Sequence, residues 1–154
     1  MNMFEIESRR PFNILLVEDN PGDVRLTQEA FKESKFFYKM YVVNDGEEAL
    51  EFLYKKQKFQ NVPIPDVILL DLNLPKIHGT EVLKEIKNDP ELKIIPVIIL
   101  TTSEADEDIL KTYQLHANSY ITKPVEFQKF LNVVRKVEEY WLSIVKLPRR
   151  KSNV

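Results

Sequence analysis

The sequence predicts an α/β protein built on one five-stranded parallel sheet, with five helices packed on its two faces. Two observations lead to this prediction. Short unbroken runs of Val, Ile and Leu, such as residues 67–70, are typical of strands that are buried on both faces of a parallel sheet. These runs alternate along the chain with segments of helical apolar spacing, and right-handed crossovers then place helices on both sides of the sheet.

Five segments have the composition of strands. The first and third are continuous apolar runs, and the second alternates only loosely but is rich in strand-forming residues. The last two are shorter apolar segments that lead into polar residues. The predicted strands cover residues 12–17, 38–43, 67–70, 96–100 and 118–121.

Each predicted strand is followed by a predicted helix. Asn20 and Pro21 are typical of an N-cap and the first position of a helix. Residues 88–90, Asn-Asp-Pro, end the third helix, and Ser103 with Asp106 resembles the capping box of the fourth. The predicted helices cover about residues 21–34, a segment around 47–53, 79–88, 103–115 and 126–145.

The composition is that of one domain with a buried core. The 154 residues include 22 basic and 24 acidic ones, for a net charge of −2. This charge gives no general attraction to nucleic acid or to an anionic membrane, and we expect neither as a partner. The absence of cysteine fits a cytoplasmic protein. We expect a domain over residues 12–145, between an N-terminal tail (1–11) and a C-terminal tail (146–154).

Polar residues suited to chemistry follow four of the predicted strands. Glu18 and Asp19 follow the first strand, Asp71 the third, Thr101 the fourth and Lys123 the fifth. The carboxyl ends of parallel strands share one edge of a sheet, and in the flavodoxin-like strand order 2-1-3-4-5 the first and third strands are neighbours. Clustered carboxylates repel each other unless protons, a cation or a lysine offsets their charge. Mg²⁺ is the expected cation, because it binds one or two carboxylates and keeps water and phosphate oxygens as further ligands.

Four segments together resemble the receiver domain of two-component response regulators. They are residues 15–19 (Leu-Leu-Val-Glu-Asp), residues 71–75 (Asp-Leu-Asn-Leu-Pro), Thr101 and residues 120–124 (Tyr-Ile-Thr-Lys-Pro). The resemblance covers residues 12–145, and the combination is far more specific than any single motif. It implies a phosphorylated signalling protein rather than an enzyme.

The resemblance also implies the roles of the acidic residues. Asp71 would accept a phosphoryl group from a histidine kinase in a Mg²⁺-dependent reaction. Glu18 and Asp19, together with Asp71, would supply the carboxylate ligands of the metal. Asn73 would bind the same metal through its backbone carbonyl.

Three further residues receive roles from the resemblance. Thr101 would hydrogen-bond to the phosphoryl oxygens, Lys123 would pair with Asp71 or its phosphate, and Tyr120 would be the aromatic switch. Movement of Tyr120 would alter the surface formed by the fourth helix, the fifth strand and the fifth helix, which is the expected output surface. Residues 115–123 and 140–142 further resemble the single-domain regulators that serve phytochrome histidine kinases.

The final helix predicts a homodimer. A helix of about 20 residues is about 30 Å long, whereas a strand of five or six residues spans only about 17–20 Å, so its last turns overhang the sheet. Trp141, Leu142 and Ile144 then need a second surface to bury them. An apolar seam with alternating spacings of three and four residues runs along this helix at Phe127, Phe130, Val134, Val137, Trp141 and Ile144.

Two other classes of protein share parts of this pattern. A Mg²⁺-dependent phosphohydrolase with an aspartyl nucleophile shares the chemistry, but the haloacid-dehalogenase type carries Asp-x-Asp, and here Asn73 takes the place of the second Asp. An FMN-binding flavodoxin shares the fold but needs a loop rich in Ser, Thr and Gly after the first strand. Residues 18–23 are Glu-Asp-Asn-Pro-Gly-Asp instead, and such acids repel phosphate.

Overall fold

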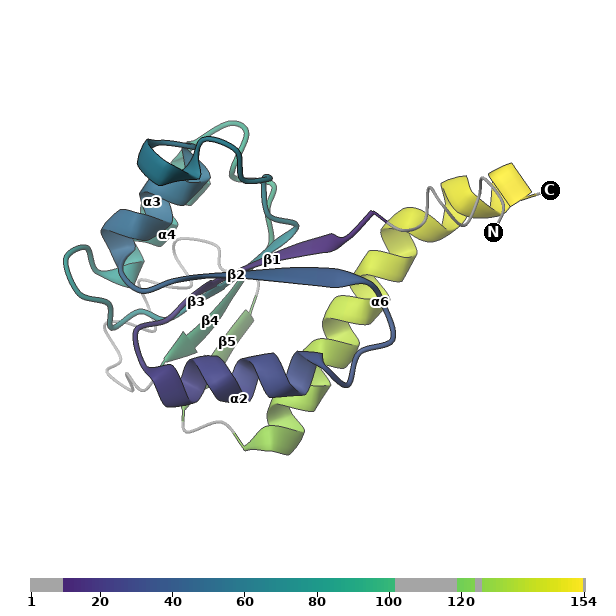
Figure 1. The fold of residues 1–154 in the computed structure, drawn as a ribbon, viewed down its shortest axis with the longest axis horizontal. Coiled ribbons are helices and arrows are strands. Elements are labelled where there is room, and N and C mark those ends of the chain that lie inside the picture. Colours follow the sequence, from purple (N-terminus) through teal and green to yellow (C-terminus); the bar gives the residue numbers. More distant parts are fainter. Residues whose placement is uncertain (1–9, 102–118, 124–125, 154) are drawn as a thin grey trace.

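The computed structural model of the protein describes residues 10–101, 119–123 and 126–153. Its strands form one sheet in which all neighbouring strands are parallel, in the order β2-β1-β3-β4-β5 (Figure 1). The predicted fold class and strand order are therefore confirmed. The strands are β1 (Phe12–Val17), β2 (Tyr38–Val43), β3 (Val67–Leu70), β4 (Val97–Thr101) and β5 (Ser119–Thr122).

Helices cover both faces of the sheet. In Figure 1, α3 and α4 lie above the sheet and α2 and α6 lie below it, and the same pairs of helices share the two apolar layers. The helix predicted over residues 103–115 lies outside the described residues. The helices are α2 (Pro21–Phe31), α3 (Gly46–Leu53), the short 3₁₀ helix η1 (Gln57–Phe59), α4 (Gly79–Asn88) and α6 (Phe127–Asn153).

The central strands contribute alternate side chains to two apolar layers. In β1, Leu15 and Val17 belong to the layer beneath α3 and α4, whereas Ile14 and Leu16 belong to the layer beneath α2 and α6. All six residues of β1 and all four of β3 are buried. Burial on both faces explains why these strands are continuous apolar runs in the sequence rather than alternating ones.

Short polar side chains begin the helices that follow β1 and β2. The predicted N-cap Asn20 accepts a hydrogen bond from the backbone N–H of Asp23 at 3.0 Å, with Pro21 in the first turn. Asp45 caps α3 in the same way through the N–H of Glu48 at 2.7 Å. Such caps satisfy backbone N–H groups that have no partner within the helix. With these caps, α2 and α3 start within a few residues of the carboxyl ends of β1 and β2.

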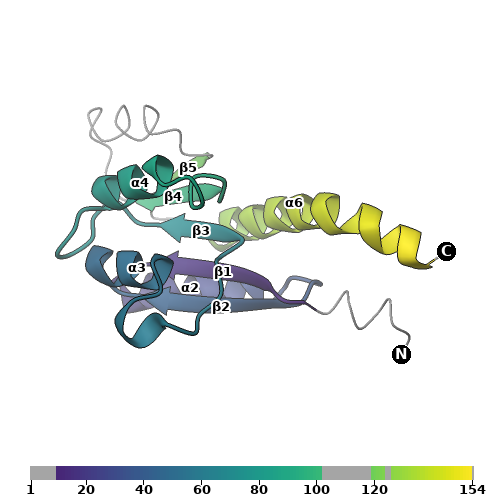
Figure 2. The ribbon, with the colours of Figure 1, turned by 90° about the horizontal axis from the view of Figure 1, so that it is seen from above.

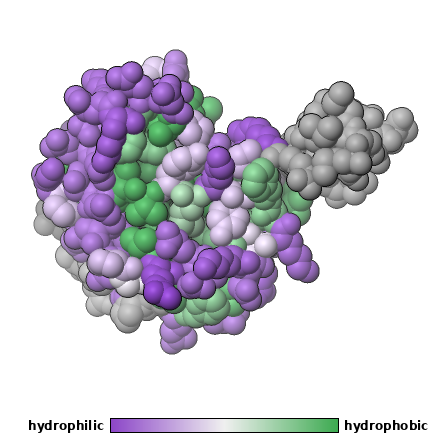
Figure 3. Space-filling model, viewed as in Figure 1, coloured by the Kyte–Doolittle hydropathy of each residue, from purple (hydrophilic) through white to green (hydrophobic). Residues whose placement is uncertain are grey.

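Strand β2 forms one edge of the sheet and lies across the front of the view in Figure 3. An apolar strip, coloured green, is bordered there by hydrophilic surface. Within β2, Met40, Tyr41 and Val42 are only partly buried, whereas Lys39 is exposed. A lysine on an edge strand opposes pairing with a strand of another molecule.

Within the described ranges, no helix combines the length and the apolar character needed to cross a membrane.

Helix α6 is longer than predicted and projects beyond the sheet (Figure 2). The prediction ended this helix at about Val145, before Pro148, which lacks a backbone N–H. The structure carries the helix through Pro148 to Asn153. Loss of one hydrogen bond is tolerated in a helix whose earlier turns are held by packing. The domain boundaries at residues 12 and 145 stay a prediction.

The prediction that Trp141 needs a second subunit to bury it is wrong. Its ring lies 4.9 Å from that of Phe12, centroid to centroid, and the Arg10 guanidinium stands 5.1 Å from its centroid. The side chain is only 7% exposed. Phe12 at the start of β1 and Arg10 two residues before it therefore cover this part of α6. Leu142 does stay 53% exposed, and the side chain of Ile144 lies outside the described residues.

We predict that Trp141→Ala destabilises the fold itself. Removing a buried aromatic side chain leaves a cavity, and such changes cost about 3–5 kcal/mol of unfolding free energy. Leu142→Ala on the same helix is the matched control and is expected to change stability by less than about 0.5 kcal/mol, because its side chain is exposed. Urea denaturation followed by circular dichroism measures both. Equal midpoints for the two variants would contradict the intramolecular burial of Trp141.

Candidate functional site

The register of β1 and β3 brings the predicted acidic residues together. Val17 pairs with Leu70 across these parallel strands, so Glu18 and Asp71 follow at the same level of the sheet. The backbone N–H of Asp71 donates to the carbonyl of Val17 at 3.0 Å. One carboxylate oxygen from each of Glu18, Asp19 and Asp71 lies within 4.8 Å of the others. The predicted acidic cluster is therefore present.

The three acids of the cluster differ in their exposure. Glu18 is 2% exposed and Asp71 is 6% exposed, whereas Asp19 lies at the surface. Two buried carboxylates side by side are unfavourable unless an opposite charge or hydrogen bonds compensate for the lost water. The backbone provides part of that compensation, because the N–H of Asn20 donates to Glu18 at 3.3 Å and the N–H of Asn73 donates to Asp71 Oδ1 at 3.0 Å.

Lys123 supplies the opposite charge. It follows β5 directly and is only 7% exposed. Its ammonium donates to Glu18 Oε1, to Asp23 Oδ2 at 3.0 Å and to Asp71 Oδ2 at 3.2 Å. Because β5 is separated from β3 by β4, the lysine side chain is what links the fifth strand to the acids on the first and third.

The pKa values of Glu18 and Lys123 reflect this mutual burial. Desolvation raises the pKa of Glu18 to about 7, and it outweighs the hydrogen bond from Lys123, which acts in the opposite direction. Burial by itself lowers the pKa of Lys123, but the hydrogen bond to Glu18 and the charges of Asp71 and Glu18 prevail and raise it to about 12. The lysine therefore keeps its positive charge at neutral pH.

The loop after β3 depends on a glycine at the start of α4. A Cβ atom on Gly79 would lie 2.4 Å from the carbonyl oxygen of Asp71 and 2.5 Å from the Cα of Leu72. The N–H of Gly79 donates to the carbonyl of Leu72 at 2.8 Å. Only a residue without a side chain allows helix α4 to begin this close to the backbone of Asp71.

The remaining predicted site residues lie on the same edge of the sheet. Asn73 is exposed in the loop after Asp71. Thr101 ends β4 and pairs with Thr122 of β5, while Tyr120 pairs with Ile99. The side chains of Thr101 and Tyr120 lie outside the described residues, so their predicted roles are not tested.

Two residues of this region were not found by sequence reasoning. Asp23 was not assigned to the site, although an acid in the first turn after a strand-end N-cap was a signal for it. His78 is partly buried and caps α4 by accepting from the N–H of Thr80 at 3.2 Å. Histidine is not among the common N-cap residues, so its role here had no sequence signal.

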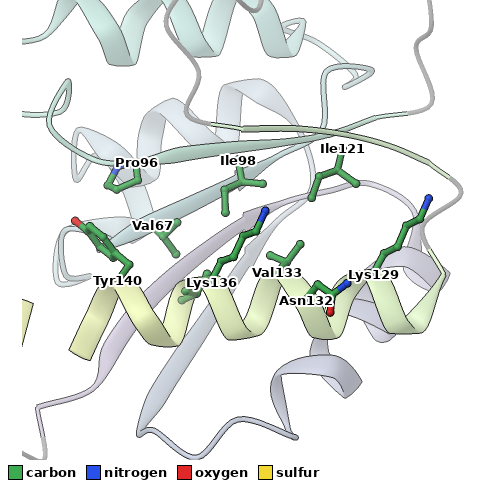
Figure 4. A pocket seen from close by; sticks show the side chains of 10 residues that line it. Val67, Pro96, Ile98, Ile121, Lys129, Asn132, Val133, Lys136 and Tyr140 are labelled. Carbon is green, nitrogen blue, oxygen red and sulfur yellow. The ribbon is translucent and has the colours of Figure 1, made fainter. Parts of the chain in front are cut away.

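A separate apolar cavity of about 450 Å³ lies between α6 and the sheet (Figure 4). Val67, Ile98 and Ile121 of the sheet and Val133 of α6 line it, with Lys129 and Lys136 on the α6 side. None of the described residues that line it carries a carboxylate, and a divalent cation needs oxygen ligands. This cavity is therefore not an alternative metal site.

Comparison with known proteins identifies the class of protein that this fold and this acidic cluster define. A sequence model of the family described as the response regulator receiver domain matches residues 14–135, and the chain belongs to this family. Receiver domains are signalling proteins that accept phosphoryl groups from histidine kinases.

Among the proteins similar to this chain is the response regulator Rcp1 of Synechocystis sp., which is 46% identical over 142 residues, covering 92% of this chain and 97% of Rcp1. The phosphorylated cyanobacterial phytochrome response regulator RcpA is 47% identical, with a TM-score of 0.78 over 88% of this chain and 96% of RcpA. The Mn²⁺-bound form of Rcp1 has the same TM-score at 45% identity, over 88% of this chain and 97% of that one. The predicted resemblance to phytochrome-linked regulators is thereby confirmed.

We predict that Gly79→Ala destabilises the protein strongly. The added methyl group meets backbone atoms that cannot move aside cheaply, and overpacking of this kind costs about 1–3 kcal/mol or more. Gly22→Ala in α2 is the control, because its Cβ would meet only the side-chain oxygen of Asn20, at 3.2 Å. That change is expected to alter stability by less than about 1 kcal/mol. Denaturant midpoints measure the difference, and similar midpoints would contradict the close approach at Gly79.

Proposed function

We propose that this protein is a response regulator that accepts a phosphoryl group from a histidine kinase on Asp71, in a reaction that requires Mg²⁺. One observation carries this proposal. The Asp71 carboxylate lies at the carboxyl edge of the sheet, beside two further acids and within 3.2 Å of a buried lysine. Positioning and charge stabilisation are the main requirements of phosphoryl transfer.

The acidic cluster fits a hard divalent cation. Glu18, Asp19 and Asp71 offer carboxylate oxygens within 4.8 Å of one another, and Asn73 follows Asp71 closely enough to add its backbone carbonyl. Oxygen ligands of this kind select Mg²⁺ or Mn²⁺. When bound, the cation would neutralise negative charge on the transferred group. The acids would otherwise repel the phosphoryl donor.

The residues of the chain perform the transfer in a simple way. A carboxylate oxygen of Asp71 attacks the phosphorus of a phosphohistidine, the P–N bond breaks, and the imidazole of the kinase leaves with the bonding electrons. Asp71 then carries an acyl phosphate. The Asn73 N–H orients one oxygen of Asp71, and Lys123 offsets the charge of the incoming oxygens.

Phosphorylation would be transmitted along β4 and β5. Thr101 and Tyr120 stand on these neighbouring strands, and we propose that the Thr101 hydroxyl binds a phosphoryl oxygen while Tyr120 rotates into the space that this movement vacates. A new charge that recruits one hydroxyl can in this way repack a surface. The output surface would comprise the segment after β4, strand β5 and helix α6.

The kinase that serves this protein is, in our proposal, a phytochrome. Support comes from the similarity of 46–47% over most of the chain to Rcp1 and to RcpA, of which the latter is a cyanobacterial phytochrome response regulator. The net charge of −2 offers no general attraction to nucleic acid, so a protein partner fits the output better.

We further propose that the protein forms a homodimer through α6. Trp141 no longer supports this idea, because it is buried within one subunit. Other apolar residues of the same helix do support it, since Leu142 is 53%, Phe127 40% and Tyr140 38% exposed. Tyr140 also borders the apolar cavity beside α6 (Figure 4). Exposed apolar residues next to an apolar hollow are typical of an interaction surface.

Acetyl phosphate with Mg²⁺ is expected to phosphorylate the wild type once, on Asp71. Intact mass spectrometry before and after incubation measures the label, and chelation of Mg²⁺ should abolish it. Asp71→Asn keeps the shape of the side chain but removes the nucleophile, so it should remain unlabelled. Labelling of Asp71→Asn to the same extent as the wild type would refute the assignment of the site.

Sedimentation velocity across a concentration series tests the dimer, with and without beryllofluoride and Mg²⁺ as a phosphoryl mimic. The wild type is expected to dimerise, and more strongly with the mimic. Leu142→Lys should shift the protein towards the monomer, because a charge replaces an exposed apolar contact. Ile94→Lys is the matched control, since Ile94 is 78% exposed and belongs to the loop between α4 and β4 rather than to α6. A wild type that stays monomeric in both states would refute the dimer.

A further inference from the structure

Asp23 is a fourth acid at the site, and it comes from a different element than the others. It lies in the first turn of α2, where its backbone N–H donates to the N-cap Asn20. Its carboxylate accepts a hydrogen bond from Lys123 at 3.0 Å. The side chain is 32% exposed, against 2% for Glu18 and 7% for Asp71. Asp23 is not part of the cluster that Glu18, Asp19 and Asp71 form.

The ammonium of Lys123 is shared among three carboxylates. A lysine has three N–H donors and no acceptor, and here they are directed to Glu18, Asp23 and Asp71. Two of these partners have another task in the proposed reaction, since Glu18 would bind the cation and Asp71 would become the acyl phosphate. Among the described residues, the Asp23 carboxylate pairs with Lys123 and has neither of these tasks, so it would keep its share of Lys123 throughout the reaction.

Asp23 therefore opposes the binding of a phosphoryl group in two ways. Its hydrogen bond occupies one donor of Lys123 that could otherwise reach a phosphoryl oxygen. Its negative charge also repels the phosphoryl oxygens, which would bind to the same Lys123 ammonium. Lys123 does not need Asp23 to keep its place, because Glu18 and Asp71 hold it from the buried side.

We propose that Asp23 is a positioning residue that shares Lys123 with the reaction centre and thereby weakens the hold of the protein on the phosphoryl group. This inference rests on the proposed function of Asp71 and extends it. The protein contains, on this account, a residue that limits the stability of its own phosphorylated state. Such a residue would let the signal decay when the kinase stops.

A purely structural role for Asp23 leads to a different expectation. An acid in the first turn of a helix interacts favourably with the helix dipole, so its replacement would lower stability without changing the affinity for a phosphoryl mimic. The N-cap hydrogen bond at this position uses the backbone N–H of residue 23, and every variant retains it. The two roles can therefore be separated by measuring binding and stability on the same proteins.

The test measures the affinity of the full-length protein for beryllofluoride at saturating Mg²⁺, by ¹⁹F NMR titration. Asp23→Asn preserves the shape and an oxygen acceptor but removes the charge, and it is expected to bind the mimic about three- to tenfold more tightly. Asp23→Glu retains the charge and should bind like the wild type. Glu29→Gln is the matched control on the same helix, because Glu29 pairs with Lys32 at 3.1 Å at the surface, and it should leave the affinity unchanged.

A second measurement follows Mn²⁺ binding without beryllofluoride, by isothermal titration calorimetry. Here Asp23→Asn is expected to bind the cation a few-fold more weakly, because the site loses a negative charge. Opposite effects on cation and mimic are a signature that damage to the fold cannot produce. Thermal unfolding of the same samples records any change in stability.

The outcomes are distinct. If the wild type binds no beryllofluoride in the presence of Mg²⁺, the proposed function itself fails. If the wild type binds it and Asp23→Asn binds it with equal or lower affinity, the proposed function stands and the role of Asp23 is refuted. If Glu29→Gln shows the same gain in affinity for beryllofluoride as Asp23→Asn, the role of Asp23 is also refuted, because the gain would then come from net charge alone.

Discussion

The ion pairs of one lysine with three acids are the interaction on which the rest of the site depends. Glu18 and Asp71 are buried side by side, and Lys123 supplies the positive charge that compensates for the water they have lost. Lys123 follows β5, which is separated from β3 by β4, so all of these strands must pair before the lysine can reach the two acids. The contacts of Lys123 with Glu18 and Asp71 therefore compensate the buried charges of the folded protein, and the proposed phosphoryl transfer depends on the same contacts.

The scaffold around this contact is rigid where the reaction would need it to be. Asp71 is held by the carbonyl of Val17 on one side and by the N–H of Asn73 on the other. Helix α4 begins directly against its backbone at Gly79. The exposed Asp19 completes the cluster from the solvent side. In the proposed function, the burial of Asp71 and the exposure of Asp19 would let a cation and a phosphoryl group approach from the solvent side.

The far end of the molecule is organised by a different cluster. Arg10 covers Trp141 and pairs with Asp66 at 3.0 Å, and Phe12 lies against the same indole ring. The start of β1 and the later turns of α6 are thereby tied together at the edge of the sheet opposite the acids. The apolar side chains of α6 that stay exposed include Phe127, Tyr140 and Leu142, and Leu142 is the most exposed of the three.

The sequence alone determined the fold class, the strand order and the acidic cluster. Short continuous apolar runs that alternate with helical segments favour a sheet covered on both faces, and polar residues at the carboxyl ends of its parallel strands then share one edge. The tertiary structure decided three things that depend on contacts between distant segments: Asp23 joins Lys123 across 100 residues, His78 caps α4, and Phe12 buries Trp141. Local periodicity does not encode such pairings, because they arise only when helices and strands far apart in the chain pack together.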